Sequence, residues 1–127
     1  MTPGFLGRWH CHRYRSAAAG KVFAFSGDTV DCPVLRKLAR GADMLAICCY
    51  AASGELTSPR LQMLARHTLA CADTVGRIAA ECGVHHLVLA HHRPRPDGAW
   101  QEGPLAEVSK DYTGPITLAV DELSMGF

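Results

Sequence analysis

Residues 21–29 read KVFAFSGDT, and this stretch decides how the chain folds. The apolar run at 22–25 suits a strand buried on both faces, and the small residues after it favour a turn at the strand's C-terminal end. Ligands and metals gather at such ends in open α/β sheets, so Asp28 is a candidate site residue. The alternative is that Asp28 or Thr29 only caps the following helix.

Length and charge narrow the class of protein. The chain has 127 residues and a formal net charge of +1. This length suits one domain, residues 1–127, and the charge gives no electrostatic argument for nucleic acid or a membrane as partner. No apolar stretch reaches the roughly 18 residues of a membrane span, and no signal sequence opens the chain. We therefore expect a cytoplasmic protein.

The six cysteines point the same way. They form no C-x-x-C pair and stand mostly within apolar segments. This pattern is typical of reduced thiols in the core of a cytosolic protein and makes a disulfide scaffold improbable.

Hydrophobic periodicity predicts one mixed sheet with helices packed against it. Helices are expected to begin near Asp31 and Ser58, each followed by a proline in the first turn. The expected strands are 5–16, 22–25, 43–50, 86–90 and 116–120, and two further helices are expected at 72–82 and 104–112. Helical connections make the later strands parallel, and the turn at 17–20 pairs the first two strands antiparallel. Residues 93–103 are expected to form a surface loop.

Three further groups of residues invite a chemical interpretation. Cys48 and Cys49 end an apolar strand near Asp28, where a thiolate ligand or nucleophile is possible, although buried thiols are favoured. His91 and its neighbour follow another strand, and at most one of these two imidazoles can face the site that Asp28 faces. The segment His10-Cys11-His12 could offer two ligands on one strand face, but alternating polar residues of a half-exposed strand explain it better.

The order of these segments resembles the C-terminal half of the metallo-β-lactamase superfamily. The matching motifs are the strand with SGDT, the GADML strand, the helix VGRIAAECGV and the strand end LVLAHHRP. The resemblance implies an α/β fold that is half of an αβ/βα sandwich, with one mixed sheet and helices on one face. It further implies Asp28 and His91 as metal ligands and His67 as a catalytic residue that contacts substrate or donates a proton. The implied cofactor is a divalent metal, zinc first, with manganese or iron as alternatives.

One part of the family pattern is absent from this sequence. The H-x-H-x-D-H motif does not occur, and two ligands are too few for a metal pair. The first hypothesis is therefore a metal-dependent hydrolase of an ester, phosphoester or lactone, with a small-molecule substrate, that needs the missing N-terminal half. The alternative is a non-catalytic binding or dimerisation module of this fold. A flavodoxin-like domain using Cys48 or Cys49 ranks third. In the first two cases the open sheet face must be buried on the missing half or on a second copy.

Overall fold

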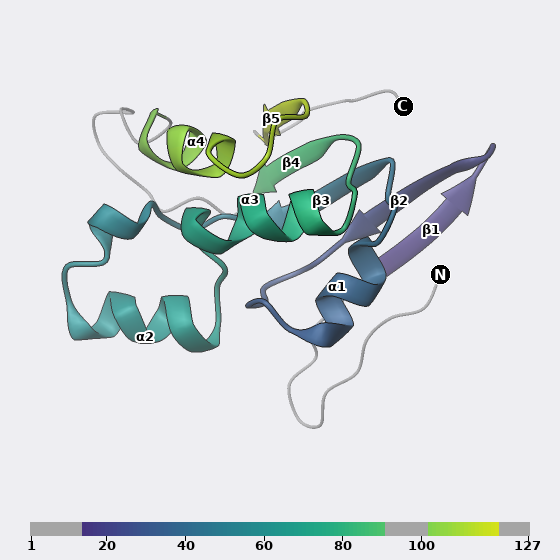
Figure 1. Cartoon of the computed structure of the whole chain (residues 1–127). Coiled ribbons are helices and arrows are strands. Elements are labelled where there is room, and N and C mark those ends of the chain that lie inside the picture. Colours follow the sequence, from purple (N-terminus) through teal and green to yellow (C-terminus); the bar gives the residue numbers. More distant parts are fainter. Residues whose placement is uncertain (1–13, 91–101, 120–127) are drawn as a thin grey trace.

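A computed structural model describes residues 14–90 and 102–119 of the chain (Figure 1). The predicted segment 5–16 and loop 93–103 therefore lie largely outside the described residues. No described helix has the length and apolarity to cross a membrane. The strands are β1 Tyr14–Ala18, β2 Lys21–Phe25, β3 Met44–Cys48, β4 Leu87–Ala90 and β5 Ile116–Leu118. The helices are α1 Pro33–Ala39, the 3-10 turn η1 Ser53–Glu55, α2 Pro59–His67, α3 Ala72–Glu81 and α4 Glu102–Ser109.

Within the described ranges, the strands form one mixed sheet in the order β1-β2-β3-β4-β5. β1 pairs antiparallel with β2, and every later pair is parallel. This arrangement confirms the predicted hairpin, whose turn at Ala19 and Gly20 has positive φ angles of 52° and 78°. It also confirms the parallel connections, because a helix separates each strand from the next. The sheet is thus the mixed α/β layer that the sequence predicted.

The core lies between the sheet and its helices. Alternate residues of the strands, such as Leu45 and Ile47 in β3, face α1 and α3 and belong to one buried cluster. From α3 this cluster contains Val75, Ile78 and Ala79, each with 0% exposure. Figure 1 shows α1, α3 and α4 on the same side of the sheet. The prediction of helices packed on one face is confirmed.

A smaller apolar cluster occupies the opposite face of the sheet. Met44, Ala46 and Val88 are its buried members, and Phe23 packs against them. Of the large exposed apolar side chains in the described part, Phe25 of β2, at 37% exposure, is the one that belongs to a strand. A wide exposed apolar face, which would demand a second copy or a missing half, is therefore not observed among the residues described.

Two predicted element boundaries are wrong. The N-cap of α1 is Cys32, not Asp31, because the Asp31 carboxylate instead forms an ion pair with Arg36. Helix α4 begins at Glu102, so the end of the predicted loop 93–103 belongs to a helix. In the first case, an ion pair with a residue five positions along the chain overrode the preference of aspartate for a helix cap.

Candidate functional site

The turn after β2 continues the sheet for one residue and then leaves it. Ser26 is buried, and its backbone N–H donates to the carbonyl of Ala46 in β3 at 2.9 Å. Gly27 follows with φ of 65°, a conformation that favours glycine. The turn therefore sets Asp28 at the edge of the sheet where the parallel strands β2 and β3 end.

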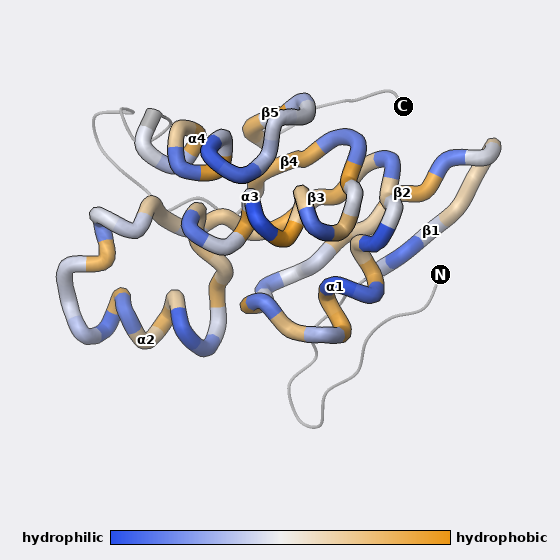
Figure 2. Tube along the Cα trace, viewed as in Figure 1, coloured by the Kyte–Doolittle hydropathy of each residue, from blue (hydrophilic) through white to orange (hydrophobic). Residues whose placement is uncertain are grey.

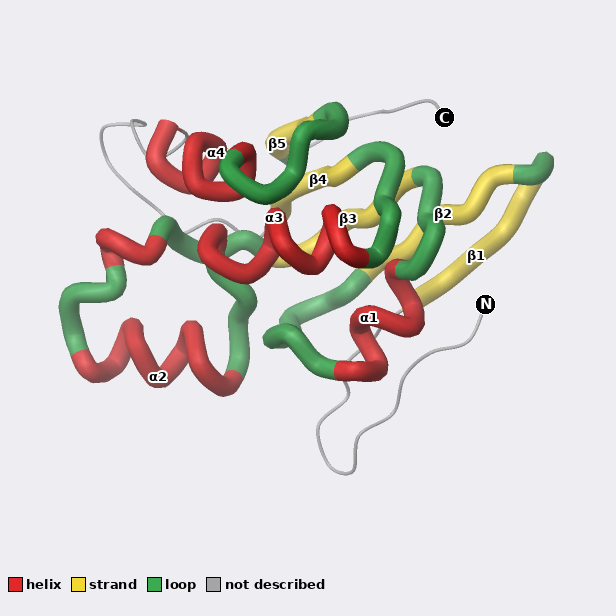
Figure 3. Tube along the Cα trace, viewed as in Figure 1, coloured by secondary structure: helices red, strands yellow, loops and turns green. Residues whose placement is uncertain are grey.

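The carbonyl oxygen of Thr29 fixes this turn. It accepts hydrogen bonds from the backbone N–H of Ala70 at 2.6 Å and from the Cys48 thiol at 3.3 Å. Thr29 is itself 4% exposed. One buried acceptor thus joins the turn to the end of β3 and to the segment after α2, which run close together in Figure 3.

The alternative that Asp28 or Thr29 caps the next helix is wrong. Helix α1 has Cys32 as its N-cap and no side-chain hydrogen bond at that cap. The Thr29 hydroxyl instead donates to the carbonyl of Val30 at 3.0 Å. Helix capping therefore does not explain the sequence of this turn.

The cysteines at the end of β3 are neutral core thiols. Burial raises the pKa of Cys48, and the negative charge of Asp28 adds to that rise. Burial raises the pKa of Cys49 to about 12. Because a nucleophile or metal ligand must be a thiolate, the catalytic interpretation of both cysteines, and the flavodoxin-like alternative built on it, find no support.

His67 is the last residue of α2, and it is exposed. Three residues later, Ala70 donates to Thr29 and accepts a hydrogen bond from the backbone N–H of Tyr50 at 3.0 Å. The backbone after His67 is therefore anchored to the residue after Asp28. A catalytic role for His67 stays a prediction.

His91, like His10 and His12, lies outside the described residues. The strand before it, β4, is described up to Ala90, which is paired with Cys48 at the end of β3. The backbone N–H of Cys49 donates to the Ala90 carbonyl at 2.8 Å. The end of β4 thus reaches the same edge of the sheet as the Asp28 turn, while the Asp28–His91 pairing stays a prediction.

A metal ion does not fit the described residues by themselves. Across residues 14–90 and 102–119, no three His, Cys, Asp or Glu side chains come together in a group that could hold one. Asp28 contributes a carboxylate at this edge, and burial raises the pKa of the neighbouring thiols, which disfavours the thiolate form that binds metals. Further ligands would have to come from elsewhere.

One contributor to the site escaped the sequence reasoning. The hydrogen bond between Thr29 and Ala70 joins two backbones, so the identity of neither side chain predicts it. A weak signal was available, since two loops that each follow an element ending at this edge have to pack together.

Comparison with known proteins gives consistent relatives. No protein-family model matches the chain. Ribonuclease Z of Thermobifida fusca is 33% identical over 108 residues, which cover 85% of this chain and 32% of that protein. Ribonuclease Z of Myxococcus xanthus is 31% identical over 102 residues, covering 80% and 31%. The chain thus spans about a third of the length of these relatives.

Solved structures share the fold. The metallo-beta-lactamase fold protein YhfI from Bacillus subtilis superposes with a TM-score of 0.71 at 17% identity, over 88% of this chain and 42% of that one. Human tRNase Z, short form, gives a TM-score of 0.56 at 20% identity, over 82% and 32%. At these identities the likeness shows the fold alone. Because the curated relatives are named ribonucleases, the expectation of no nucleic-acid partner is not supported.

Proposed function

We propose that this chain, whose fold is that of the C-terminal part of metallo-β-lactamase proteins, supplies one half of a metal-dependent hydrolase. Residues 1–127 would act as a single unit. A segment with the H-x-H-x-D-H motif, on this or another chain, would complete the site. Among ester, lactone and phosphoester substrates, the relatives named ribonuclease Z favour a phosphodiester of RNA over a small molecule.

The position of Asp28 carries this proposal. Its turn stands where two parallel strands end, and the buried Thr29 carbonyl holds that turn to two other segments. Strand ends of this kind collect ligands in α/β sheets. A carboxylate held there by the backbone around it is suited to a metal site, which needs fixed ligands.

The remaining ligands would come from outside the described residues. Under this proposal Asp28 and His91 would hold the metal, which would activate a water for hydrolysis, and His67 would contact the substrate. Zinc, manganese and iron all accept a site of His and carboxylate ligands.

The exposed Phe25 side chain on the sheet favours a second candidate. A non-catalytic module of the same fold would bind a second copy or another chain through the sheet face that carries Phe25, and would need no metal. The two candidates differ in whether activity depends on Asp28.

The test is reconstitution. The purified chain is mixed with the N-terminal part of the Thermobifida fusca relative, which covers the region that this chain does not match, and cleavage of a labelled RNA is followed in the presence of zinc or manganese. We expect little turnover from either part alone and clear turnover from the mixture. Asp28→Asn should lower that turnover at least 100-fold, because it removes the carboxylate charge and keeps the shape.

Asp111→Asn is the matched control, since Asp111 is exposed and follows α4, and it should leave turnover unchanged. Thermal unfolding of both variants should match that of the parent chain. Turnover that survives Asp28→Asn would refute the assigned site. Failure of every mixture, together with a stable dimer in sedimentation, would favour the non-catalytic module.

A further inference from the structure

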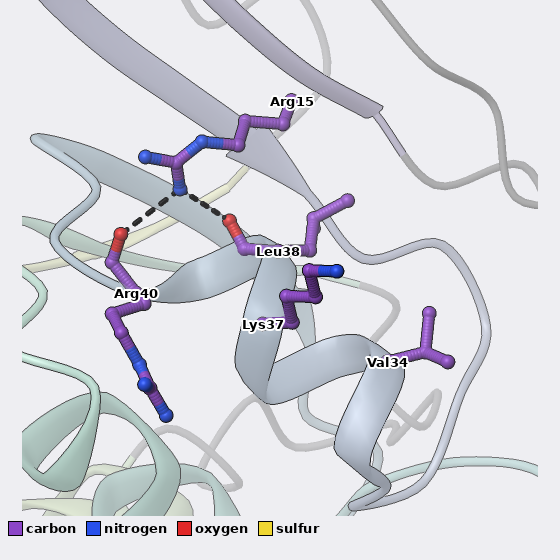
Figure 4. A pocket seen from close by; sticks show the side chains of 5 residues that line it. All are labelled: Arg15, Val34, Lys37, Leu38 and Arg40. Carbon is purple, nitrogen blue, oxygen red and sulfur yellow. Dashed lines mark hydrogen bonds between the residues drawn. The ribbon is translucent and has the colours of Figure 1, made fainter.

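A groove on the flank of α1 lies away from the Asp28 turn. Its volume is about 520 Å³. Its described lining consists of Arg15 from β1 and of Val34, Lys37, Leu38 and Arg40 from α1 and its C-terminal end (Figure 4). The lining thus combines two apolar side chains with three cationic residues.

Arg15 is fixed at one end of this groove. It is in register with Ala24, whose side chain is in the core beneath the helices, so Arg15 also points to the helix side of the sheet. Its Nη1 donates to the carbonyls of Leu38 and Arg40 at 2.7 and 2.9 Å (Figure 4). Both carbonyls lie at the C-terminal end of α1, where backbone carbonyls lack partners within the helix. The Nε and Nη2 groups of the same guanidinium remain as donors.

The charge of the groove is not balanced within the described part of the chain. No carboxylate there lies within ion-pair distance of Arg15, Lys37 or Arg40. Arg36 of the same helix contrasts with them, because it pairs with Asp31 and Glu81. Lys37 and Arg40 are exposed. Cations at a helix C-terminus interact favourably with the helix dipole. What distinguishes these three residues is that they line one groove together.

The charged residues are also distributed unevenly along the sequence. Residues 1–40 contain seven Lys or Arg and two Asp, a net charge of +5, whereas residues 41–127 contain six Lys or Arg and ten Asp or Glu, a net charge of −4. The overall charge of +1 therefore hides a basic first third. A local field of this kind attracts a polyanion even when the whole chain is nearly neutral.

We propose that the groove binds backbone phosphates of an RNA strand, at a point separate from the bond that is cleaved. This inference rests on the proposed function for the choice of RNA. Helix α1 begins just after the Asp28 turn and ends at the groove. Its seven residues span roughly 10 Å at about 1.5 Å per residue. An RNA strand of a few nucleotides can therefore reach from the turn to the groove.

The test measures binding of a fluorescein-labelled, mixed-sequence 12-nucleotide RNA to the 127-residue chain in EDTA, at several salt concentrations. The double variant Lys37→Gln/Arg40→Gln removes two exposed cations and keeps Arg15, whose bonds hold the end of α1. We expect about 10-fold weaker binding at low salt. The slope of log affinity against log salt should fall by about 1.4, or 0.7 for each lost phosphate contact of a single strand.

The matched control is Arg60→Gln/Arg66→Gln on α2, which removes two exposed cations and the same net charge. It should change RNA affinity less than 2-fold, and both variants should keep the thermal unfolding of the parent chain. Equal losses in the two variants, or no RNA binding by the parent chain, would overturn the proposal. So would poly-glutamate binding as tightly as RNA with the same dependence on Lys37 and Arg40, since the groove would then prefer an acidic peptide. Because the assay needs neither metal nor cleavage, it can fail while the hydrolase proposal stands.

Discussion

Helices α2 and α3 both lie in the connection between β3 and β4, yet they contribute differently to the fold. Helix α3 buries five residues, among them Val75 and Ile78. Helix α2 buries none, and its Met63 is 55% exposed. In Figure 1, α3 lies against the sheet while α2 stands apart from it, and Figure 2 shows apolar and polar residues alternating along both.

The difference teaches that an amphipathic pattern predicts a helix without predicting what covers its apolar side. Local interactions define the start of helix α2. The Ser58 hydroxyl accepts a hydrogen bond from the backbone N–H of Leu61 at 3.2 Å, and Pro59 occupies the first turn. Its apolar residues Leu61, Leu64 and Ala65 are only half-buried. Helix α3 instead depends on packing. Of these two helices, α3 therefore contributes more to the stability of the fold, and the segment that joins them bonds to the Asp28 turn through Ala70.

The largest expected effect is on the free energy of unfolding, when one apolar side chain in each helix is shortened to alanine. Ile78→Ala in α3 should lower the free energy of unfolding by about 3 kcal/mol, because it leaves a cavity at a site of 0% exposure. Leu64→Ala in α2 should cost less than about 1 kcal/mol, because solvent already reaches that side chain. Urea denaturation of the two variants measures both values. Similar losses would mean that α2 is packed as tightly as α3.

An added methyl group gives a smaller contrast. A Cβ on Gly76 of α3 would collide with the backbone carbonyl of Val108 in α4. We expect Gly76→Ala to destabilise the protein by about 2 kcal/mol, even though alanine is more favourable than glycine within a helix by about 1 kcal/mol. Gly54→Ala, in the turn η1 before α2, meets nothing within 4 Å and should change stability by less than about 0.5 kcal/mol. Thermal unfolding of both variants measures the contrast, and a neutral Gly76→Ala would refute the close packing of α3 on α4.

The smallest effect concerns the charges that join α1 to α3. Arg36 bonds to Asp31 and to Glu81 at the end of α3, and the hydrogen bond from Arg36 lowers the pKa of Asp31 below its usual 3.8. A lowered folded pKa stabilises the protein above the unfolded pKa, and this contribution disappears as the pH falls through the folded value. Asp31→Asn should therefore cost at most about 1 kcal/mol at pH 7. Its unfolding free energy should approach that of the parent chain as the pH falls from about 4, near the unfolded pKa, through the lower folded pKa. A constant difference across that range would show that the ion pair is not its source.

Most of the fold could be predicted from the sequence because its signals are local. Gly41 and Gly83 follow the ends of α1 and α3 with φ of 67° and 68°, the left-handed conformation in which glycine often ends a helix. The Ser58 cap was predicted for the same reason. The Asp31 cap failed, because the carboxylate had a competing partner five residues along the chain.

The candidate site was predictable only in part. An apolar strand followed by a glycine predicts the SGDT turn, and the structure has this turn at the end of β2. The contact of Thr29 with Ala70 joins backbones 41 residues apart, and the groove at Arg15 forms where a strand meets a helix end 25 residues later. Such long-range meetings depend on the three-dimensional path of the chain, which no local pattern encodes.

The strands of the described sheet stand side by side in the order in which they occur along the chain. This order affects how the protein can assemble during synthesis. As each strand leaves the ribosome, the neighbour it pairs with has already been made, so the sheet can grow from one edge without waiting for a distant segment. In the described sheet β5 is the last strand to be made, and it pairs with β4. A nascent chain that ends after α3 would already contain β1, β2 and β3, with β3 as the growing edge of the sheet and the Asp28 turn complete behind it.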